Sequence, residues 1–243
     1  MFWKKIEGLL ALPVSSRVAL TLFLCVAGLG YLLGLSNIFV SYSGRDGKPG
    51  LSMEDIRFVF SGSGGGTRLE KAVDGPMKVN FASDQDYKAV KAWLKAGATE
   101  AGFNSVKGIF QSQCATCHSA DARTGGVVLE SYSDFSPVLQ KDTGMSVPRL
   151  ISLSHLHVMG ILFLVFLLCL VFSFTAFSEP VKIVVMAFSL CSIVADIGSW
   201  WLAKFVASLA PLVIIGGACL ALAFLALILL SLYDLWLRKA KAS

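Results

Sequence analysis

The residues best suited to chemistry form the pentapeptide Cys114-Ala-Thr-Cys117-His118. This is the C-x-x-C-H pattern of c-type haem attachment, in which two thiols about one helical turn apart each bond to the same porphyrin. The adjacent imidazole then lies beneath the iron as its proximal ligand. Because the pattern demands both the thiol spacing and the following histidine, it is far more specific than a cysteine pair. We therefore expect one covalent haem c.

Two other chemistries of the cysteine pair stay open, with less support. A redox dithiol of the thioredoxin type needs a strand-helix-strand setting, and no such pattern surrounds the motif. A zinc site needs further ligands, and the polar stretch around the motif has no other cysteine or histidine. The remaining cysteines lie singly within apolar runs, where cysteine usually behaves as a small buried hydrophobe (Cys25, Cys169, Cys191 and Cys219).

The composition predicts that this motif belongs to a helical membrane protein. Of the 243 residues, 55% are hydrophobic and 15% are charged, which is too apolar for an ordinary soluble domain. Four apolar runs are long enough to cross a hydrocarbon core of ~30 Å, at residues 18–40, 152–177, 181–205 and 212–236. The net charge of +5 comes from basic residues interspersed with acidic ones, so we expect lipid but no nucleic acid as a partner.

These runs divide the chain into three expected parts. Residues 1–40 would form a cytoplasmic N-terminus and a first helix, 41–150 a haem domain, and 151–243 a three-helix membrane domain. The first run is longer than a signal-peptide core and has no small-x-small site before Ser41, which favours a retained helix. Basic residues mark the ends expected in the cytoplasm (Lys4, Lys5, Arg17, Lys182, Arg238, Lys239 and Lys241). We thus expect a bacterial inner-membrane protein with a periplasmic haem domain and both termini in the cytoplasm.

Two helices are expected within the haem domain, so that the whole chain would be mainly α. Ser83 offers an N-cap to an amphipathic helix, which Gly97 would end. A second helix over residues 103–118 would carry the C-x-x-C-H motif together with an apolar face. The glycine-rich stretch 61–67 lacks the signature of a phosphate-binding loop and is interpreted as plain loop.

The stretch VKGIFQSQCATCHSADARTGGVVLESYSDF, residues 106–135, resembles the planctomycete-type cytochrome c domain. In that family a helix ending in C-x-x-C-H is followed by a Gly-Gly-Val/Leu-x-Leu-x-Ser segment, then by a distal methionine and a closing helix that ends Trp-x-x-x-Gly-Ala. Here Asp-Gly-Pro-Met77 and a helix ending Trp93-Leu-Lys-Ala-Gly-Ala come before the motif. The resemblance therefore implies a circularly permuted cytochrome c domain, with Met77 as the sixth iron ligand.

Other outcomes for the sixth iron site stay open. Met145, after the motif, and His155 or His157, at the start of the second apolar run, are rival ligands, and the iron can also be five-coordinate. Met77 can equally be a core methionine without a metal role. A thioether ligand would raise the reduction potential relative to ligation by two histidines.

Three polar residues lie within the expected membrane spans. Asp196 is an ionisable group at membrane depth, and such groups usually face a bundle interior, a cavity or a partner. His155 and His157 point ~200° apart on one helix, so only one of them can face a given point, and an internal haem with two histidine ligands is not expected. Either histidine could contact Asp196. Such a contact would indicate a quinol-binding pocket or a structural hydrogen bond between two helices, and we favour the structural interpretation. Further residues near the span ends are read as interfacial (Trp200, Trp201, Tyr233 and Asp234).

Together these features predict a membrane-anchored monohaem cytochrome that transfers electrons in a respiratory chain. The whole chain also resembles a group of bacterial four-helix membrane cytochromes, which supports the same architecture. The expected partners are donor and acceptor proteins or quinone, and other subunits of a larger complex, because a quinol gives up two electrons and one haem accepts one. Two alternatives are quinol oxidation within this subunit at His155, His157 and Asp196, and a haem-based redox or gas sensor. An electron carrier is favoured over a stand-alone enzyme.

Overall fold

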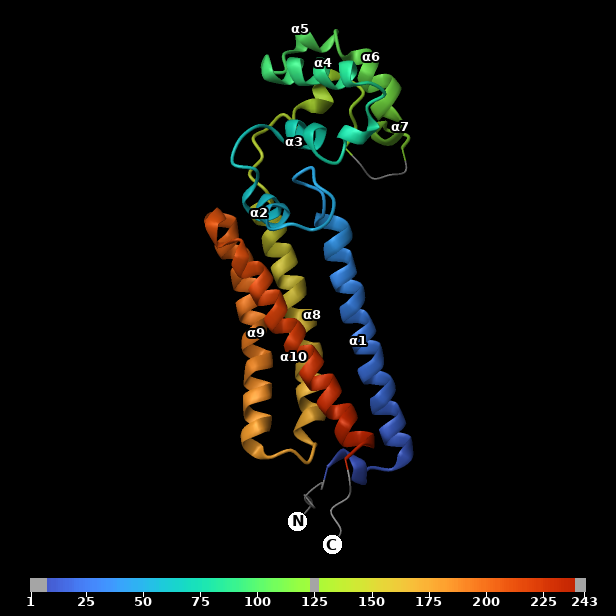
Figure 1. Cartoon of the computed structure of the whole chain (residues 1–243), viewed down its shortest axis with the longest axis vertical. Coiled ribbons are helices and arrows are strands. Elements are labelled where there is room, and N and C mark those ends of the chain that lie inside the picture. The colour runs from blue at the N-terminus through green and yellow to red at the C-terminus, as the bar shows by residue number, and fades with distance from the viewer. Residues whose placement is uncertain (1–7, 123–126, 239–243) are drawn as a thin grey trace. The chain divides into compact units, whose positions relative to one another are not determined.

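The computed structural model describes residues 8–122 and 127–238 of the chain (Figure 1). The chain divides into two compact units. Residues Met1–Ser41 and Met145–Ser243 form the first, here called the membrane unit, and Tyr42–Gly144 form the second, here called the polar unit. Within the described ranges the regular elements are all helical, apart from an isolated bridge between Thr67 and Lys141. The predicted mainly α fold of a helical membrane protein is confirmed.

Long apolar helices build the membrane unit: α1 (Val14–Tyr42), α8 (Val147–Ser173), α9 (Glu179–Phe205) and α10 (Pro211–Trp236). Each is long and apolar enough to cross a membrane, with mean hydropathies between 2.0 and 2.9 in the most apolar windows. Proline lies in the first turn of the last three helices, where its missing N–H has no intrahelical partner to lose. The predicted multi-pass membrane protein is confirmed.

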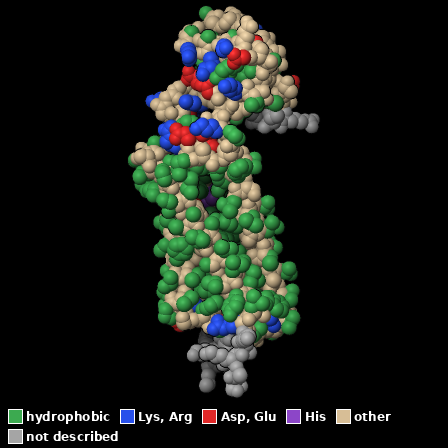
Figure 2. All heavy atoms as spheres, viewed as in Figure 1, with side chains coloured by type: hydrophobic (Ala, Val, Ile, Leu, Met, Phe, Trp, Pro, Cys, Tyr) green, Lys and Arg blue, Asp and Glu red, His purple; other side chains and the backbone are tan. Residues whose placement is uncertain are grey.

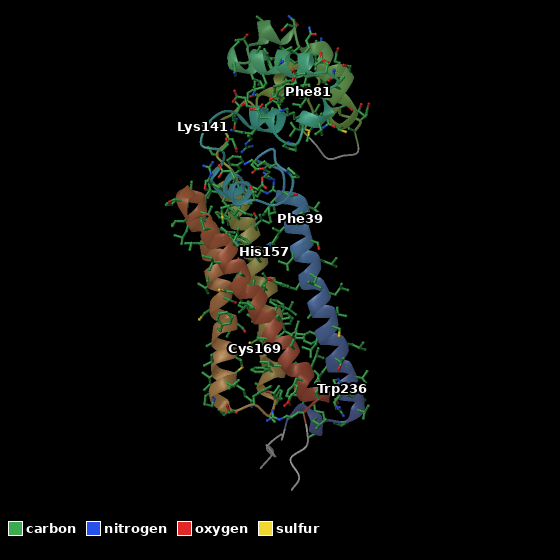
Figure 3. All side chains as sticks on the ribbon, in the orientation of Figure 1. Phe39, Phe81, Lys141, His157, Cys169 and Trp236 are labelled. Atoms are coloured by element: carbon green, nitrogen blue, oxygen red, sulfur yellow. The ribbon has the colours of Figure 1, made fainter. Side chains whose placement is uncertain are left out.

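The faces of these helices differ in what they contact. Apolar side chains cover the visible face of the membrane unit (Figure 2), as expected for a surface that meets lipid rather than water. Phe39 on α1, labelled in Figure 3, is 54% exposed, whereas Cys169 on α8 is 6% exposed. The cysteine thus packs as a small apolar residue, as the sequence predicts for it.

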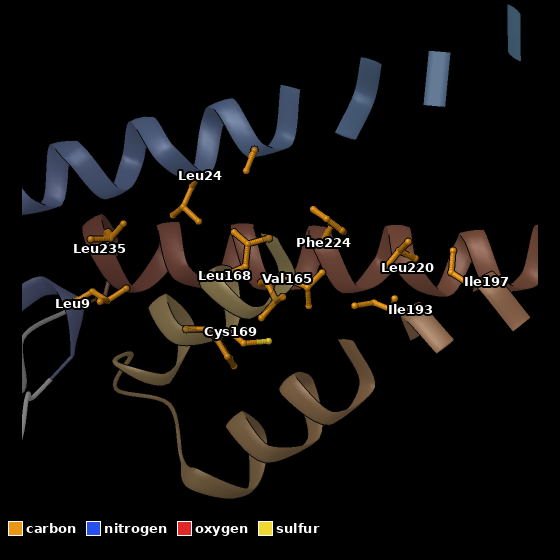
Figure 4. Packing of buried hydrophobic residues seen from close by; sticks show 13 residues of the cluster. Leu9, Leu24, Val165, Leu168, Cys169, Ile193, Ile197, Leu220, Phe224 and Leu235 are labelled. Atoms are coloured by element: carbon orange, nitrogen blue, oxygen red, sulfur yellow. The ribbon is translucent and has the colours of Figure 1, made fainter. Parts of the chain in front are cut away.

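A continuous apolar cluster fills the interior of the membrane unit (Figure 4). All four long helices contribute to it, through residues such as Leu24 of α1, Leu168 of α8, Ile193 of α9 and Phe224 of α10. The 3₁₀ turn η1 (Leu9–Ala11) adds the buried side chain of Leu9. The N-terminal segment is therefore part of the same core as the three C-terminal helices.

Asp234, which the sequence predicts to lie near the end of the last span, is buried inside the membrane unit. Its side chain lies near the end of α10 and has no exposed surface. The carboxylate accepts hydrogen bonds from the backbone N–H of Leu9 at 2.7 Å and of Ala176 at 3.1 Å, and it pairs with Arg238 at 3.0 Å. Because a buried charge must be paired and hydrogen-bonded, these partners make the burial tolerable. One carboxylate thereby ties η1 and the α8–α9 turn to α10.

Short helices make up the polar unit: α2 (Met53–Ser61), α3 (Arg68–Asp74), η2 (Lys78–Asn80), α4 (Asp84–Lys95), α5 (Glu100–Phe103), α6 (Lys107–Ile109), η3 (Phe110–Cys114), α7 (Ala115–His118) and η4 (Tyr132–Phe135). Helix α4 begins where Ser83 accepts the backbone N–H of Asp86, and it ends before Gly97, whose φ is +88°. The predicted amphipathic helix is therefore confirmed. The glycine-rich stretch after α2 is a loop, as predicted.

The second predicted helix, over residues 103–118, is confirmed from Lys107 to His118, but its predicted start at Phe103 is wrong. The chain ends α5 at Phe103, turns, and resumes helix at Lys107. Ser105 explains the break, because both its N–H and its hydroxyl bond the Gly102 carbonyl and so compete with helical hydrogen bonding. The element η3 that follows is a π-helical turn, a widened turn that is frequent at functional sites.

Replacement of Asp234 tests its role as the anchor of the membrane unit. In Asp234→Ala the N–H groups of Leu9 and Ala176 lose a buried acceptor, so we expect a loss of stability of about 2–4 kcal/mol. The measurement is the thermal midpoint Tm of the full chain in detergent. Glu179→Gln is the control, because Glu179 pairs with Lys182 while its side chain is 77% exposed, and its Tm should stay close to wild type. Equal Tm values for the two variants would contradict the anchor role.

Candidate haem-binding site

His118 is held by its backbone and by its ring. Ring atom Nδ1 lies 2.8 Å from the carbonyl oxygen of Val127. A carbonyl oxygen can only accept a hydrogen bond, so Nδ1 carries the proton and Nε2 presents its lone pair. The backbone N–H of Leu129 donates to the His118 carbonyl at 2.8 Å, which fastens the same segment a second time. A neutral histidine whose other nitrogen donates to a carbonyl is the form that ligates metals.

The two thiols sit on the same turn as this imidazole. Cys114 is the N-cap of α7, and Cys117 lies within α7. None of the cysteines, all of which fall within the described residues, is in a disulfide. Burial, and then the nearby Cys117, raise the pKa of the Cys114 thiol. Redox dithiols of the thioredoxin type have a lowered thiol pKa, so this environment disfavours the dithiol alternative.

The groups of the C-x-x-C-H motif also differ from the ligands that a bare metal ion requires. Among residues 8–122 and 127–238, no three His, Cys, Asp or Glu side chains converge as ligands of an ion. A structural zinc ion takes four protein ligands, whereas a haem iron takes at most one protein ligand on each face of its macrocycle. Two thiols and one imidazole on a single turn therefore fit the attachment of a haem better than the binding of zinc.

An aromatic core positions the turn that carries these groups. The indole of Trp93, on α4, lies with its ring centre 5.8 Å from that of Phe103, 5.9 Å from that of Phe110 and 5.7 Å from that of Phe135. Its N–H donates to the Thr99 carbonyl at 3.0 Å, which satisfies the one polar group of a buried indole. Because Phe110 begins the π turn that ends at Cys114, this packing fixes the thiols against α4.

Met77 lies on a short segment whose first end is attached to α4. Asp74 precedes it and accepts the Tyr87 hydroxyl at 2.9 Å, while the Lys91 ammonium lies 2.8 Å from the same carboxylate oxygen. Burial alone would raise the pKa of Asp74, but the hydrogen bonds from Lys91 and Tyr87 hold it below its usual value. The Met77 N–H then bonds the Ala72 carbonyl at 2.8 Å, which turns the chain toward η2.

The second end of the Met77 segment is attached to the cysteine-bearing helix. The Ala82 N–H donates to the side-chain oxygen of Gln113 at 2.9 Å, and the amide nitrogen of Gln113 lies 3.0 Å from the Asp86 carboxylate. Gln113 is the residue before Cys114 in the chain. The structure therefore links the Met77 segment both to α4 and to the start of the haem-attachment turn.

The four candidate sixth ligands fall in different units. Met77 belongs to the polar unit, as His118 does, whereas Met145, His155 and His157 belong to the membrane unit. The Met77 side chain is 37% exposed, with Sδ 3.8 Å from the Asn80 amide. Partial exposure leaves the thioether accessible to a bound group, in contrast to a core methionine.

The structure brings together some of the polar residues predicted within the spans. The His157 ring meets the Trp200 ring edge-on at 5.0 Å, and the Trp200 side chain hydrogen-bonds Asp196. His155 is exposed, as His157 is, but among the described residues its ring makes no hydrogen bond or ring contact with this group. Trp200, which the sequence predicts to be interfacial, contacts both of these polar residues.

Some predictions fall on residues that the structure leaves undescribed. Residues 123–126, in the stretch that resembles a cytochrome c domain, lie outside the described ranges. The same holds for four of the basic flanking residues (Lys4, Lys5, Lys239 and Lys241).

The Asp74 attachment predicts a specific pH dependence. The folded-state pKa lies below the unfolded value of ~3.9, so the ionised carboxylate stabilises the fold above that pH, and the contribution is lost as pH falls through the folded-state value. Asp74→Asn should lower Tm at pH 7 by the equivalent of under about 1 kcal/mol, because the pair is part-exposed. The difference from wild type should shrink below pH ~4. Asp84→Asn is the control, since its pair with Lys88 is 70% exposed. A difference that stays constant down to pH 3 would contradict this assignment.

A protein-family model described as a transmembrane helical domain matches residues 141–242, a range that includes α8, α9 and α10. No cytochrome c domain is identified in the chain. Neither the curated proteins nor the solved structures gave a match. In this part of the chain, family similarity and fold therefore agree on a domain of membrane-spanning helices.

Proposed function

We propose that this protein is a membrane-anchored monohaem c-type cytochrome that transfers electrons as a subunit of a larger respiratory complex. The observation that carries the proposal is the turn from Cys114 to His118. It presents two thiols and an imidazole whose Nε2 is left for a metal, because Nδ1 donates to the Val127 carbonyl. These are the groups that covalent attachment and proximal ligation of one haem require.

Each residue would have a definite task toward that haem. Cys114 and Cys117 would hold it through thioether bonds, His118 would ligate its iron through Nε2, and Met77 would supply the sixth ligand. When bound, the haem supplies a one-electron redox couple. The Val127 carbonyl keeps the imidazole oriented and makes Nε2 more basic. The apolar core behind Cys114 would shield one side of the site from water.

Exposed apolar side chains near the motif support the same proposal. Val127 is 45% exposed beside His118, and Val79, two residues after Met77, is 86% exposed. A flat apolar group that covered such surface would gain ~25 cal/mol per Å² removed from water. The site thus offers a haem apolar contacts as well as ligands.

Charge in the membrane unit supports the proposed orientation. Arg17 near the start of α1, Lys182 near the start of α9 and Arg238 after α10 lie at the same end of the bundle (Figure 1). The Arg17 guanidinium also donates to the Leu235 carbonyl at 2.6 Å and lies 3.9 Å from the centre of the Trp236 ring. Lys and Arg are enriched on the cytoplasmic side of membrane proteins. We therefore assign this end to the cytoplasm of a bacterial cell, and the opposite side, the periplasm, to the polar unit.

The electron count favours a subunit over an independent enzyme. A single haem takes up or releases one electron at a time, whereas common membrane donors such as quinols release two. A partner with a further redox centre would accept the second electron. Four helices in a multi-pass unit provide a surface on which such a partner can be held.

Substitution of Met77 tests the assignment of the sixth ligand. Loss of the thioether in Met77→Ala should lower the reduction potential and abolish the absorption band that arises from methionine ligation of oxidised haem. Met53→Ala is the matched control, because Met53 is also in the polar unit and is 44% exposed. Its spectrum and potential should equal those of wild type.

The rival ligands are tested by the same two measurements. If the band survives in Met77→Ala and disappears in Met145→Ala, the sixth ligand is Met145 and the permuted arrangement is wrong. Absence of a methionine band from the wild-type protein, with a potential that changes in His155→Ala or His157→Ala, would assign the ligand to that histidine. Binding of carbon monoxide to the reduced wild-type protein without loss of a ligand would indicate five-coordinate iron and favour a sensor.

A further inference from the structure

Polar side chains from three helices of the membrane unit lie at one depth. Tyr31 of α1, His157 of α8 and Asp196 of α9 are each about ten residues, or ~15 Å of helix, from the end of the bundle where α1 ends and α8 begins. Polar groups at such depth are costly in hydrocarbon and usually mark functional positions.

Asp196 is 7% exposed and packs closely against α10. A Cβ atom on Gly216 would lie 2.7 Å from the Asp196 Cα, so α10 packs directly against α9 at this point. The carboxylate is hydrogen-bonded by the Trp200 side chain, and it interacts electrostatically with His157 and with the Tyr31 hydroxyl. Asp196 therefore lies close enough to the other two polar residues to interact with both.

His157 presents a hydrogen-bond acceptor at this position. Its Nδ1 lies 2.9 Å from the Leu153 carbonyl of its own helix, so Nδ1 is the donor, and in the neutral ring Nε2 has a lone pair. In the described part of the chain Nε2 has no hydrogen-bond partner. Figure 2 shows a histidine inside a hollow in the otherwise apolar face of the membrane unit, and Figure 3 labels His157 at that place. His157 thus lies at an open hollow rather than within the packed core.

Tyr31 adds a hydroxyl that can both donate and accept. Its ring is stacked on that of Phe224, with ring centres 4.5 Å apart. Among the described residues the hydroxyl has no hydrogen-bond partner. An unpaired polar group in hydrocarbon costs several kcal/mol, so a ligand that satisfies both Tyr31 and His157 would remove two such costs.

We infer that Tyr31, His157 and Asp196 bind the headgroup of a membrane-soluble quinone or quinol. Such a ligand reaches the site through the lipid, and its flat ring can lie against the half-buried aromatic ring of Trp200. The oxygen atoms of the headgroup can hydrogen-bond both unpaired groups. A quinol hydroxyl can donate to His157 Nε2, and a quinone carbonyl oxygen can accept from the Tyr31 hydroxyl. The inference that a quinone binds here rests only on this geometry. A role of the ligand as electron donor rests on the proposed function.

The test is a binding measurement on the full-length protein in lipid nanodiscs. A short-chain ubiquinone or menaquinone analogue is titrated, and quenching of tryptophan fluorescence is followed, since Trp200 lies at the site. We expect saturable quenching, with Kd raised about tenfold in Tyr31→Phe and in His157→Ala, as for the loss of one hydrogen bond to the ligand. His155→Ala is the matched control, because its side chain lies on the same helix and outside the group. Its Kd should be unchanged.

Two outcomes would overturn the inference. Quenching that does not saturate would show that the analogue only dissolves in the lipid. Saturable binding that is equal in Tyr31→Phe, His157→Ala and wild type would place the ligand elsewhere and leave the group as a structural link between helices. Neither result depends on the haem, because the readout is binding. Haem attachment without quinone binding would refute this inference alone, and quinone binding without haem would refute the proposed function alone.

Discussion

The contact of Trp93 with Phe103, Phe110 and Phe135 determines where the C-x-x-C-H turn lies in the polar unit. Trp93 comes from a helix that precedes the turn, whereas the three phenylalanines flank the turn on both sides along the chain. Without this packing, α4 and the turn would lose the centre of their shared core, to which the Met77 segment is attached at both ends. A permuted chain order is compatible with a cytochrome c domain for this reason, because the site depends on which helices pack together rather than on which comes first.

Two buried aspartates show how differently the membrane unit uses charge. Asp234 is surrounded by partners from its own chain, with two backbone N–H groups and Arg238 around one carboxylate. Asp196 is hydrogen-bonded by Trp200, and two groups that interact with it electrostatically, Tyr31 and His157, have atoms without a hydrogen-bond partner in the described chain. In hydrocarbon, where water cannot compensate, full internal pairing indicates a structural role. Incomplete pairing at an open hollow indicates a place for a ligand.

The features that the sequence predicted well are those encoded locally. Apolar runs predicted the long helices, and Ser83 predicted the start of α4, because length, hydropathy and capping act over neighbouring residues. The burial of Asp234 could not be predicted, since its partner Leu9 is 225 residues away in the chain. Tyr31 was missed because a single tyrosine in an apolar run gives no periodic signal. The break at Ser105 was missed because local serine bonding competes with the helix in a way that spacing does not reveal.

The most direct test of the account is whether the chain carries a covalent haem. Full-length protein purified from membranes of a host with a cytochrome c maturation system is denatured, and its mass and its haem-dependent peroxidase stain are measured, beside a variant with Cys114→Ala and Cys117→Ala. The account predicts that the wild-type chain has the mass of the polypeptide plus one haem and stains on the denaturing gel, and that the variant does neither. A wild-type chain with the bare polypeptide mass and no stain would contradict the assignment of this protein as a c-type cytochrome.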